Sequence, residues 1–131
     1  KNNKGVNFPG ISLDIDSVTD NDIENINLAL KYDIDLLALS FVRYSTDINP
    51  ILKEFKIKNK TIPVIAKIEK PEGIENLDSI LETFDGVLIA RGDLGVELPL
   101  SKLPVLQKTI IEKCRKNYHQ HPYNHQYRLY I

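Results

Sequence analysis

The sequence predicts an α/β fold in which parallel strands alternate with helices. Three short apolar runs begin near residues 35, 62 and 86, and helical patterns of apolar residues separate them. A repeat of about 25 residues is typical of right-handed βα units in a parallel sheet. A closed (β/α)8 barrel needs eight strands and about 250 residues. With three recognisable strands, the chain looks like part of a domain.

Composition excludes several classes of protein. The chain has 131 residues, of which 42% are hydrophobic and 27% charged, and this suits a soluble globular domain with a core. No apolar run approaches the ~20 residues needed to cross a bilayer, and the N-terminus lacks a signal-peptide core, so a cytoplasmic protein is expected. The net charge of -1 with dispersed basic residues argues against nucleic-acid binding. The single cysteine, Cys114, agrees with a reducing compartment.

The N-terminal third is expected to contain one helix and one strand. Residues 1–18 look like an irregular lead-in. Thr19 and Asp22 have the spacing of a capping box, so a helix is predicted over about 20–32. The apolar run Leu36–Val42 then predicts a strand that is covered on both faces.

Three further helices follow, which makes four in all. Ser45 or Thr46 is expected to cap the second, Pro71 to open the third, and Pro104 to precede a fourth that ends near Lys116. Their buried stripes are expected at Ile48, Ile51, Leu52 and Phe55, at Ile74, Leu77, Ile80, Leu81 and Phe84, and at Leu103, Leu106, Ile110 and Cys114.

The composition changes at about Asn117. Residues 117–131 hold all three histidines and four of the six tyrosines, but no acidic residue. A polar, aromatic string interrupted by Pro122 stands where the repeat would place another strand. We therefore expect a domain over residues 1–116 and an atypical, irregular tail over 117–131.

Charged side chains stand at the ends of two neighbouring strands. Lys67 and Glu69 lie two residues apart, so both point to the same face of an extended chain, about 7 Å apart at ~3.3 Å per residue. The next strand ends in Arg91–Gly95, where glycines on both sides of Asp93 favour a tight loop. Ligands of parallel α/β folds gather at such strand ends. The alternatives are a salt-bridged pair on an edge strand and, for Asp93, a turn-forming role.

The three charged groups suggest a chemistry. Two carboxylates that face each other repel unless one takes up a proton or a hard cation binds between them. Magnesium is the natural candidate, because it favours one or two carboxylates together with water and substrate oxygens. Lys67 would add a positive charge beside it. Such a set suits phosphoryl transfer or enolate chemistry.

Four motifs, in the same order and spacing, resemble the pyruvate kinase family over residues 5 to about 116. They are Gly5–Gly10 (GVNFPG), Ala38–Arg43 (ALSFVR), Ile65–Glu69 (IAKIE) and Ile89–Glu97 (IARGDLGVE). The first resembles the segment that returns from the family's cap domain, and the others resemble its fourth, fifth and sixth barrel strands. The resemblance implies a partial TIM (β/α)8 barrel, with three parallel strands alternating with four helices.

The resemblance also implies a function, namely phosphoryl transfer from phosphoenolpyruvate to ADP in glycolysis, giving pyruvate and ATP. In the matching positions, Lys67 would be catalytic and contact the transferring phosphoryl group. Glu69 and Asp93 would bind Mg²⁺ or Mn²⁺, and the backbone amides of Gly92 and Asp93 would contact the substrate. Ser40 resembles a residue near the family's K⁺ site. No nucleic-acid or membrane partner is implied.

Several family segments have no counterpart in this chain: the first three barrel strands, the cap domain, the last two barrel strands and the C-terminal domain. Most segments through which the family forms homo-oligomers are also missing. We therefore expect the isolated chain to be inactive. The alternatives are a non-catalytic, metal-binding remnant, and a lyase or aldolase of the related phosphoenolpyruvate/pyruvate barrels. The Arg91–Gly95 motif argues against the second alternative.

Overall fold

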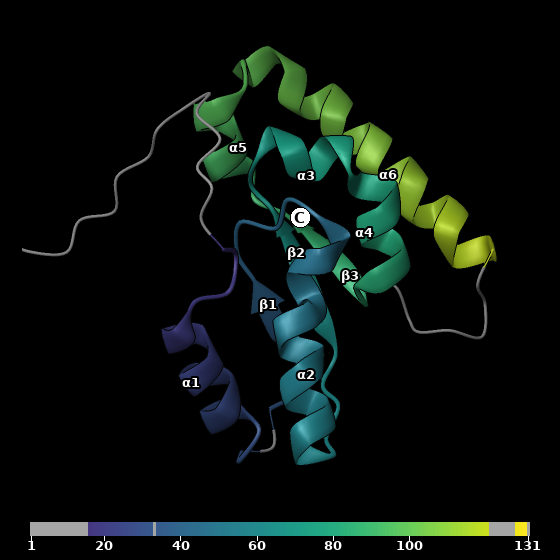
Figure 1. Ribbon diagram of the computed structural model, residues 1–131. Coiled ribbons are helices and arrows are strands. Elements are labelled where there is room, and N and C mark those ends of the chain that lie inside the picture. The colour runs from purple at the N-terminus through teal and green to yellow at the C-terminus, as the bar shows by residue number, and fades with distance from the viewer. Residues whose placement is uncertain (1–15, 33, 121–127, 131) are drawn as a thin grey trace, which may run out of the picture.

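The computed structural model describes residues 16–32, 34–120 and 128–130, with side chains up to Lys116, and its centre is a parallel sheet (Figure 1). The strands are β1 (Leu37–Leu39), β2 (Val64–Ile68), β3 (Gly86–Ile89) and β4 (Arg128–Tyr130). They lie in the order β1-β2-β3-β4, and every neighbouring pair is parallel. The predicted α/β class is confirmed. The Gly5–Gly10 motif and most of the expected lead-in lie outside the described residues.

The first helix, α1 (Asp20–Ala29), starts at the predicted capping box. The Thr19 backbone N–H donates to Asp22 Oδ2 at 2.8 Å, and the Asp22 N–H donates to Thr19 Oγ1 at 3.3 Å. This reciprocal pair satisfies two amides that the helix cannot bond internally. The helix ends about three residues earlier than predicted, and Ile26 and Leu30 bury its apolar side.

Strand β1 is shorter than the predicted Leu36–Val42, and it is not covered on both faces, because Ala38 is exposed. The strand ends early because of Phe41, whose φ of 57° places it in the left-handed region that non-glycine residues seldom adopt. The chain therefore leaves the extended conformation directly after β1.

The second helix begins with a 3-10 turn, η1 (Ser45–Ile48), and continues as α2 (Asn49–Lys58). The expected cap by Ser45 or Thr46 is wrong. Asp47, the third residue of the turn, closes its N-terminus instead, since its Oδ2 accepts from the N–H groups of Arg43 at 2.8 Å and Tyr44 at 3.0 Å. Ile48, Ile51 and Phe55 are buried as predicted, whereas Leu52 is 46% exposed.

The third predicted helix is divided into α3 (Pro71–Glu75) and α4 (Leu77–Thr83). Asn76 makes the break. Its Nδ2 donates to the carbonyl oxygens of Arg43 at 3.1 Å and Glu72 at 2.9 Å, so it ties the bend to the loop after β1. The predicted stripe of these two helices is confirmed, with Leu77, Ile80, Leu81 and Phe84 buried and Ile74 partly buried.

The expected loop at Arg91–Gly95 is wrong, because this segment forms the first part of a short helix, α5 (Arg91–Glu97). Leu94 is fully buried, and its N–H donates to the Ala90 carbonyl at 3.0 Å. Burial of this one leucine anchors a turn that the flanking glycines would otherwise leave free.

The last helix, α6 (Leu103–Gln120), follows a 3-10 turn, η2 (Leu100–Lys102). Its predicted stripe is confirmed, since Leu103, Ile110 and Cys114 are buried and Leu106 is partly buried. The helix passes the expected end near Lys116 by about one turn.

The expectation of an irregular tail is wrong for part of residues 117–131. The first four of them belong to α6, and Arg128–Tyr130 forms β4 beside β3, with Val87 opposite Leu129. The edge of β3 presents unpaired backbone groups that favour any extended segment, and leucine and tyrosine are good strand formers. The domain boundary at residue 116 stays a prediction.

Helices cover one face of the sheet, and Figure 1 shows α2 and α4 in front of the strands, with α3 and α5 at one end of the sheet. Val64, Ala66 and Ile68 of β2 belong to the core that these helices bury, which leaves Lys67 on the opposite face. Within the described part of the chain, no helix is long and apolar enough to cross a membrane.

Cys114 makes the stability of the fold depend on pH in the alkaline range. Burial raises the pKa of its thiol from 9.0 to about 11, because desolvation disfavours the thiolate. The folded state therefore holds the proton more tightly. The stabilisation that this tighter proton binding provides is fully present below pH 9 and is lost as the pH rises through 11. Urea denaturation at several pH values should show this loss, and Cys114→Ala should remove it.

Candidate functional site

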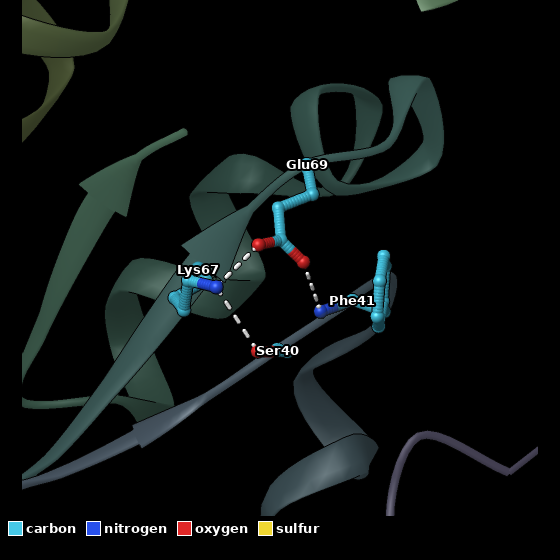
Figure 2. Close-up of polar contacts among 4 residues, drawn as sticks. All are labelled: Ser40, Phe41, Lys67 and Glu69. Carbon is cyan, nitrogen blue, oxygen red and sulfur yellow. Dashed lines mark hydrogen bonds and ion pairs between the residues drawn. The ribbon is translucent and has the colours of Figure 1, made fainter. Parts of the chain in front are cut away.

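The site is built on β2, the strand between β1 and β3. Lys67 and Glu69 stand at its carboxyl end, and the Lys67 Nζ lies 2.5 Å from Glu69 Oε1 (Figure 2). The two side chains point to the same face, as the strand period predicts. The sequence left open a salt-bridged pair on an edge strand. The salt bridge is present, but β2 is not an edge strand, so the predicted edge position is wrong.

Glu69 is a buried charge, with 2% of its surface exposed. Its Oε2 accepts from the backbone N–H of Phe41 at 2.8 Å, while Oε1 faces Lys67 (Figure 2). The left-handed conformation of Phe41, with φ of 57°, belongs to the turn that presents this N–H. A buried carboxylate is costly unless it is paired and hydrogen-bonded, and Glu69 has both kinds of partner.

Lys67 links β2 to the end of β1. Its Nζ donates to Ser40 Oγ at 3.1 Å as well as pairing with Glu69. An ammonium has three N–H groups, and the Lys67 side chain is 28% exposed, so one N–H can still reach a ligand on the open side. Ser40, predicted to lie near a K⁺ site, therefore contacts Lys67.

Gly92 and Asp93 lie in the first turn of α5, and both are exposed. This turn begins at the same sheet edge as Glu69, because Ile68 pairs with Ile89 and the Ala90 N–H donates to the Ile68 carbonyl at 3.2 Å. The amides of Gly92 and Asp93 precede the first hydrogen bond of the helix and point away from its body. A Cβ at Gly92 would meet nothing within 4 Å, so the space beside this turn is open.

The structure brings three of the predicted residues into contact, and Asp93 is not bonded to them. Ser40, Lys67 and Glu69 are in direct contact. Among the described residues, Asp93 makes no ion pair or hydrogen bond with Lys67 or Glu69. Three acidic, histidine or cysteine side chains do not converge anywhere in the described part of the chain. Any metal here would have to take one or two carboxylates and complete its shell with other oxygens.

Two features of the site were missed from sequence. One is the Phe41 amide, since an apolar residue in an apolar run gives no sign of a left-handed backbone. The other is an ion pair between Lys70 and Glu97, which joins the residue after Glu69 to the end of α5. Their separation of 27 residues carries no local signal.

Comparison with known proteins identifies the family. The protein-family model described as "Pyruvate kinase, barrel domain" matches residues 1–120 of this chain. Among curated relatives, pyruvate kinase 2 of Synechocystis sp. is 50% identical over 87% of this chain and 19% of its own length. The pyruvate kinase of Mycobacterium intracellulare is 44% identical over 88% of this chain and 25% of its own length, and that of Staphylococcus saprophyticus is 45% identical over 88% and 20%.

The chain spans 19% to 25% of the length of these relatives. Parallel strands alternating with helices are consistent with part of an α/β barrel, as the resemblance implied. The family match includes β1, β2, β3 and α5, which carry the site described above. The match over residues 1–120 shows that this chain belongs to the pyruvate kinase family.

Proposed function

We propose that the residues around Lys67 and Glu69 form a phosphoryl-transfer site for phosphoenolpyruvate and ADP. The observation that carries the proposal is the buried Glu69 carboxylate, held beside the Lys67 ammonium at the carboxyl end of a central strand. Ligands of parallel α/β folds bind at that end of the strands. Glutamates are seldom fully buried unless they are paired, and the pair of Glu69 with Lys67 lies at the strand end where ligands bind.

In this reaction, the bond between the phosphorus and the enol oxygen of phosphoenolpyruvate breaks. A bond from the phosphorus to a β-phosphate oxygen of ADP forms, and the enolate that is released takes up a proton to give pyruvate. Negative charge is spread over the transferring phosphoryl oxygens in the transition state. Lys67, with Glu69 and Ser40 fixing its position, would place its ammonium against that charge.

The donor set fits a magnesium ion. Glu69 and Asp93 supply two carboxylates, and Mg²⁺ prefers one or two of them together with water and substrate oxygens. Each oxygen of Glu69 has one bonded partner in the structure and two lone pairs, so it retains acceptor capacity. Glu69 and Asp93 would hold the ion, which would supply positive charge to the substrate phosphate. Mn²⁺ would fit the same oxygens.

The remaining assignments concern the substrate and a monovalent ion. The amides of Gly92 and Asp93 stand beside open space at the start of α5, where they would contact the substrate carboxylate. Ser40 lies next to Lys67, so a K⁺ ion near Ser40 would act on the same substrate region.

Metal binding tests this proposal directly. We expect the 131-residue chain to bind Mn²⁺, detected as a loss of the free-ion signal in electron paramagnetic resonance. Asp93→Asn should weaken Mn²⁺ binding by about a hundredfold. Loss of a group that only supports a metal ligand costs about 10- to 100-fold in affinity, and loss of a ligand itself should reach the upper end of that range. The matched control is Asp78→Asn, which neutralises a carboxylate that is 71% exposed and paired with Lys113.

The outcomes separate the alternatives. Equal binding by the Asp93→Asn and Asp78→Asn variants would remove Asp93 from the proposed metal site. Mn²⁺ binding without ADP phosphorylation from phosphoenolpyruvate would favour a non-catalytic, metal-binding role for this chain. Cleavage of a carbon–carbon bond in a 2-keto acid would favour a lyase or aldolase instead.

A further inference from the structure

Helix α5 needs outside support to hold a fixed position. It has seven residues, and isolated helices of this length are not stable in water. No side chain caps its N-terminus. Its body is anchored by Leu94, which is fully buried. A polar contact at the C-terminal end of α5 can therefore decide where the helix lies.

That anchor is the ion pair between Lys70 and Glu97. Glu97 is the last residue of α5, and its side chain is 2% exposed. A carboxylate in the last turn of a helix opposes the helix dipole, and its burial adds a desolvation penalty. Glu97 therefore does not stabilise α5 as a helix. Its partner Lys70 supplies the compensating charge from the end of β2.

The two consecutive residues Glu69 and Lys70 thus serve two different contacts. Glu69 turns to Lys67 and the Phe41 amide, whereas Lys70 holds the end of α5. Asp93 lies four residues before Glu97, about 6 Å away along the helix axis at ~1.5 Å per residue. A shift of α5 would consequently change the position of Asp93 relative to Glu69.

We propose that Lys70 and Glu97 are positioning residues, whose ion pair fixes α5 so that Asp93 and Glu69 reach the same metal ion. This inference rests on the proposed function of Glu69 and Asp93 as metal ligands. Lys70 and Glu97 themselves do not contact the ion. Their effect on metal binding passes through Asp93.

A double-mutant cycle tests this path. Lys70→Met should weaken Mn²⁺ binding by the chain about tenfold, the range seen when a group that supports a metal ligand is removed. In the Asp93→Asn background, Lys70→Met should have little further effect, because the ligand that it positions is already gone. The reversed pair, Lys70→Glu with Glu97→Lys, should recover part of the lost affinity. Equal losses with and without the Asp93 carboxylate would show a general structural effect and overturn the proposal.

Hydrogen exchange separates this inference from the proposed function. Lys70→Met should speed amide exchange in α5, while Lys113→Met, which breaks the more exposed Lys113–Asp78 pair, should not. Unchanged exchange in α5 would overturn the positioning role whether or not Mn²⁺ binds. Faster exchange in a chain that binds no Mn²⁺ would support the anchoring of α5 by Lys70 and would contradict only the proposed metal site.

Discussion

Replacing Lys67 with methionine is expected to lower the free energy of unfolding at pH 7 by roughly 2 to 4 kcal/mol, near the range for breaking a buried ion pair. The change leaves the Glu69 carboxylate 2% exposed and without its cation. The estimate extends below that of a fully buried pair because the Lys67 side chain is 28% exposed. Urea denaturation followed by circular dichroism measures the loss.

The double variant Lys67→Met with Glu69→Gln is the informative control. It removes both charges, yet a glutamine oxygen can still accept from the Phe41 N–H. Buried ion pairs replaced by neutral groups are often no less stable, so we expect recovery to within about 1 kcal/mol of the original chain. The double variant would regain stability although it lacks the Glu69 carboxylate, which is the proposed metal ligand. If the double variant were as unstable as Lys67→Met alone, the pair would be a stabilising element, and its burial would no longer argue for a binding site.

Gly73→Ala is expected to destabilise the fold by about 1 to 3 kcal/mol, the usual range for overpacking a core. A Cβ at Gly73 would lie 2.5 Å from the carbonyl oxygen of Val42, so α3 would have to move away from the loop after β1. The effect opposes helix propensity, which alone would favour alanine by about 1 kcal/mol.

Gly92→Ala is the matched comparison for Gly73→Ala. Both glycines lie in short helices, but a Cβ at Gly92 would meet no atom within 4 Å. We expect its unfolding free energy to stay within about 1 kcal/mol of the original, as for an exposed helix position. Equal destabilisation by the two alanines would show that helix backbone effects, rather than the contact with Val42, decide the result.

The sequence by itself determined the order of the βα units and most of the core. Apolar periodicity reflects the local geometry of helices and strands, so it located β2, β3 and the buried stripes of α4 and α6. The strand period also placed Lys67 and Glu69 on one face, where they form the predicted pair. These features depend on residues that are close in the chain.

Tertiary structure decided what depends on distant residues. The left-handed turn at Phe41 brings an amide to Glu69, 28 residues away, and no local pattern announces it. Burial of Leu94 makes Arg91–Gly95 helical where its glycines favour a loop. Residues 128–130 pair with β3, because that strand has an edge to which an extended segment can bond. The Lys70–Glu97 pair likewise exists only because β2 and α5 meet, since an ion pair needs two charges close in space and leaves no trace in the spacing of either residue.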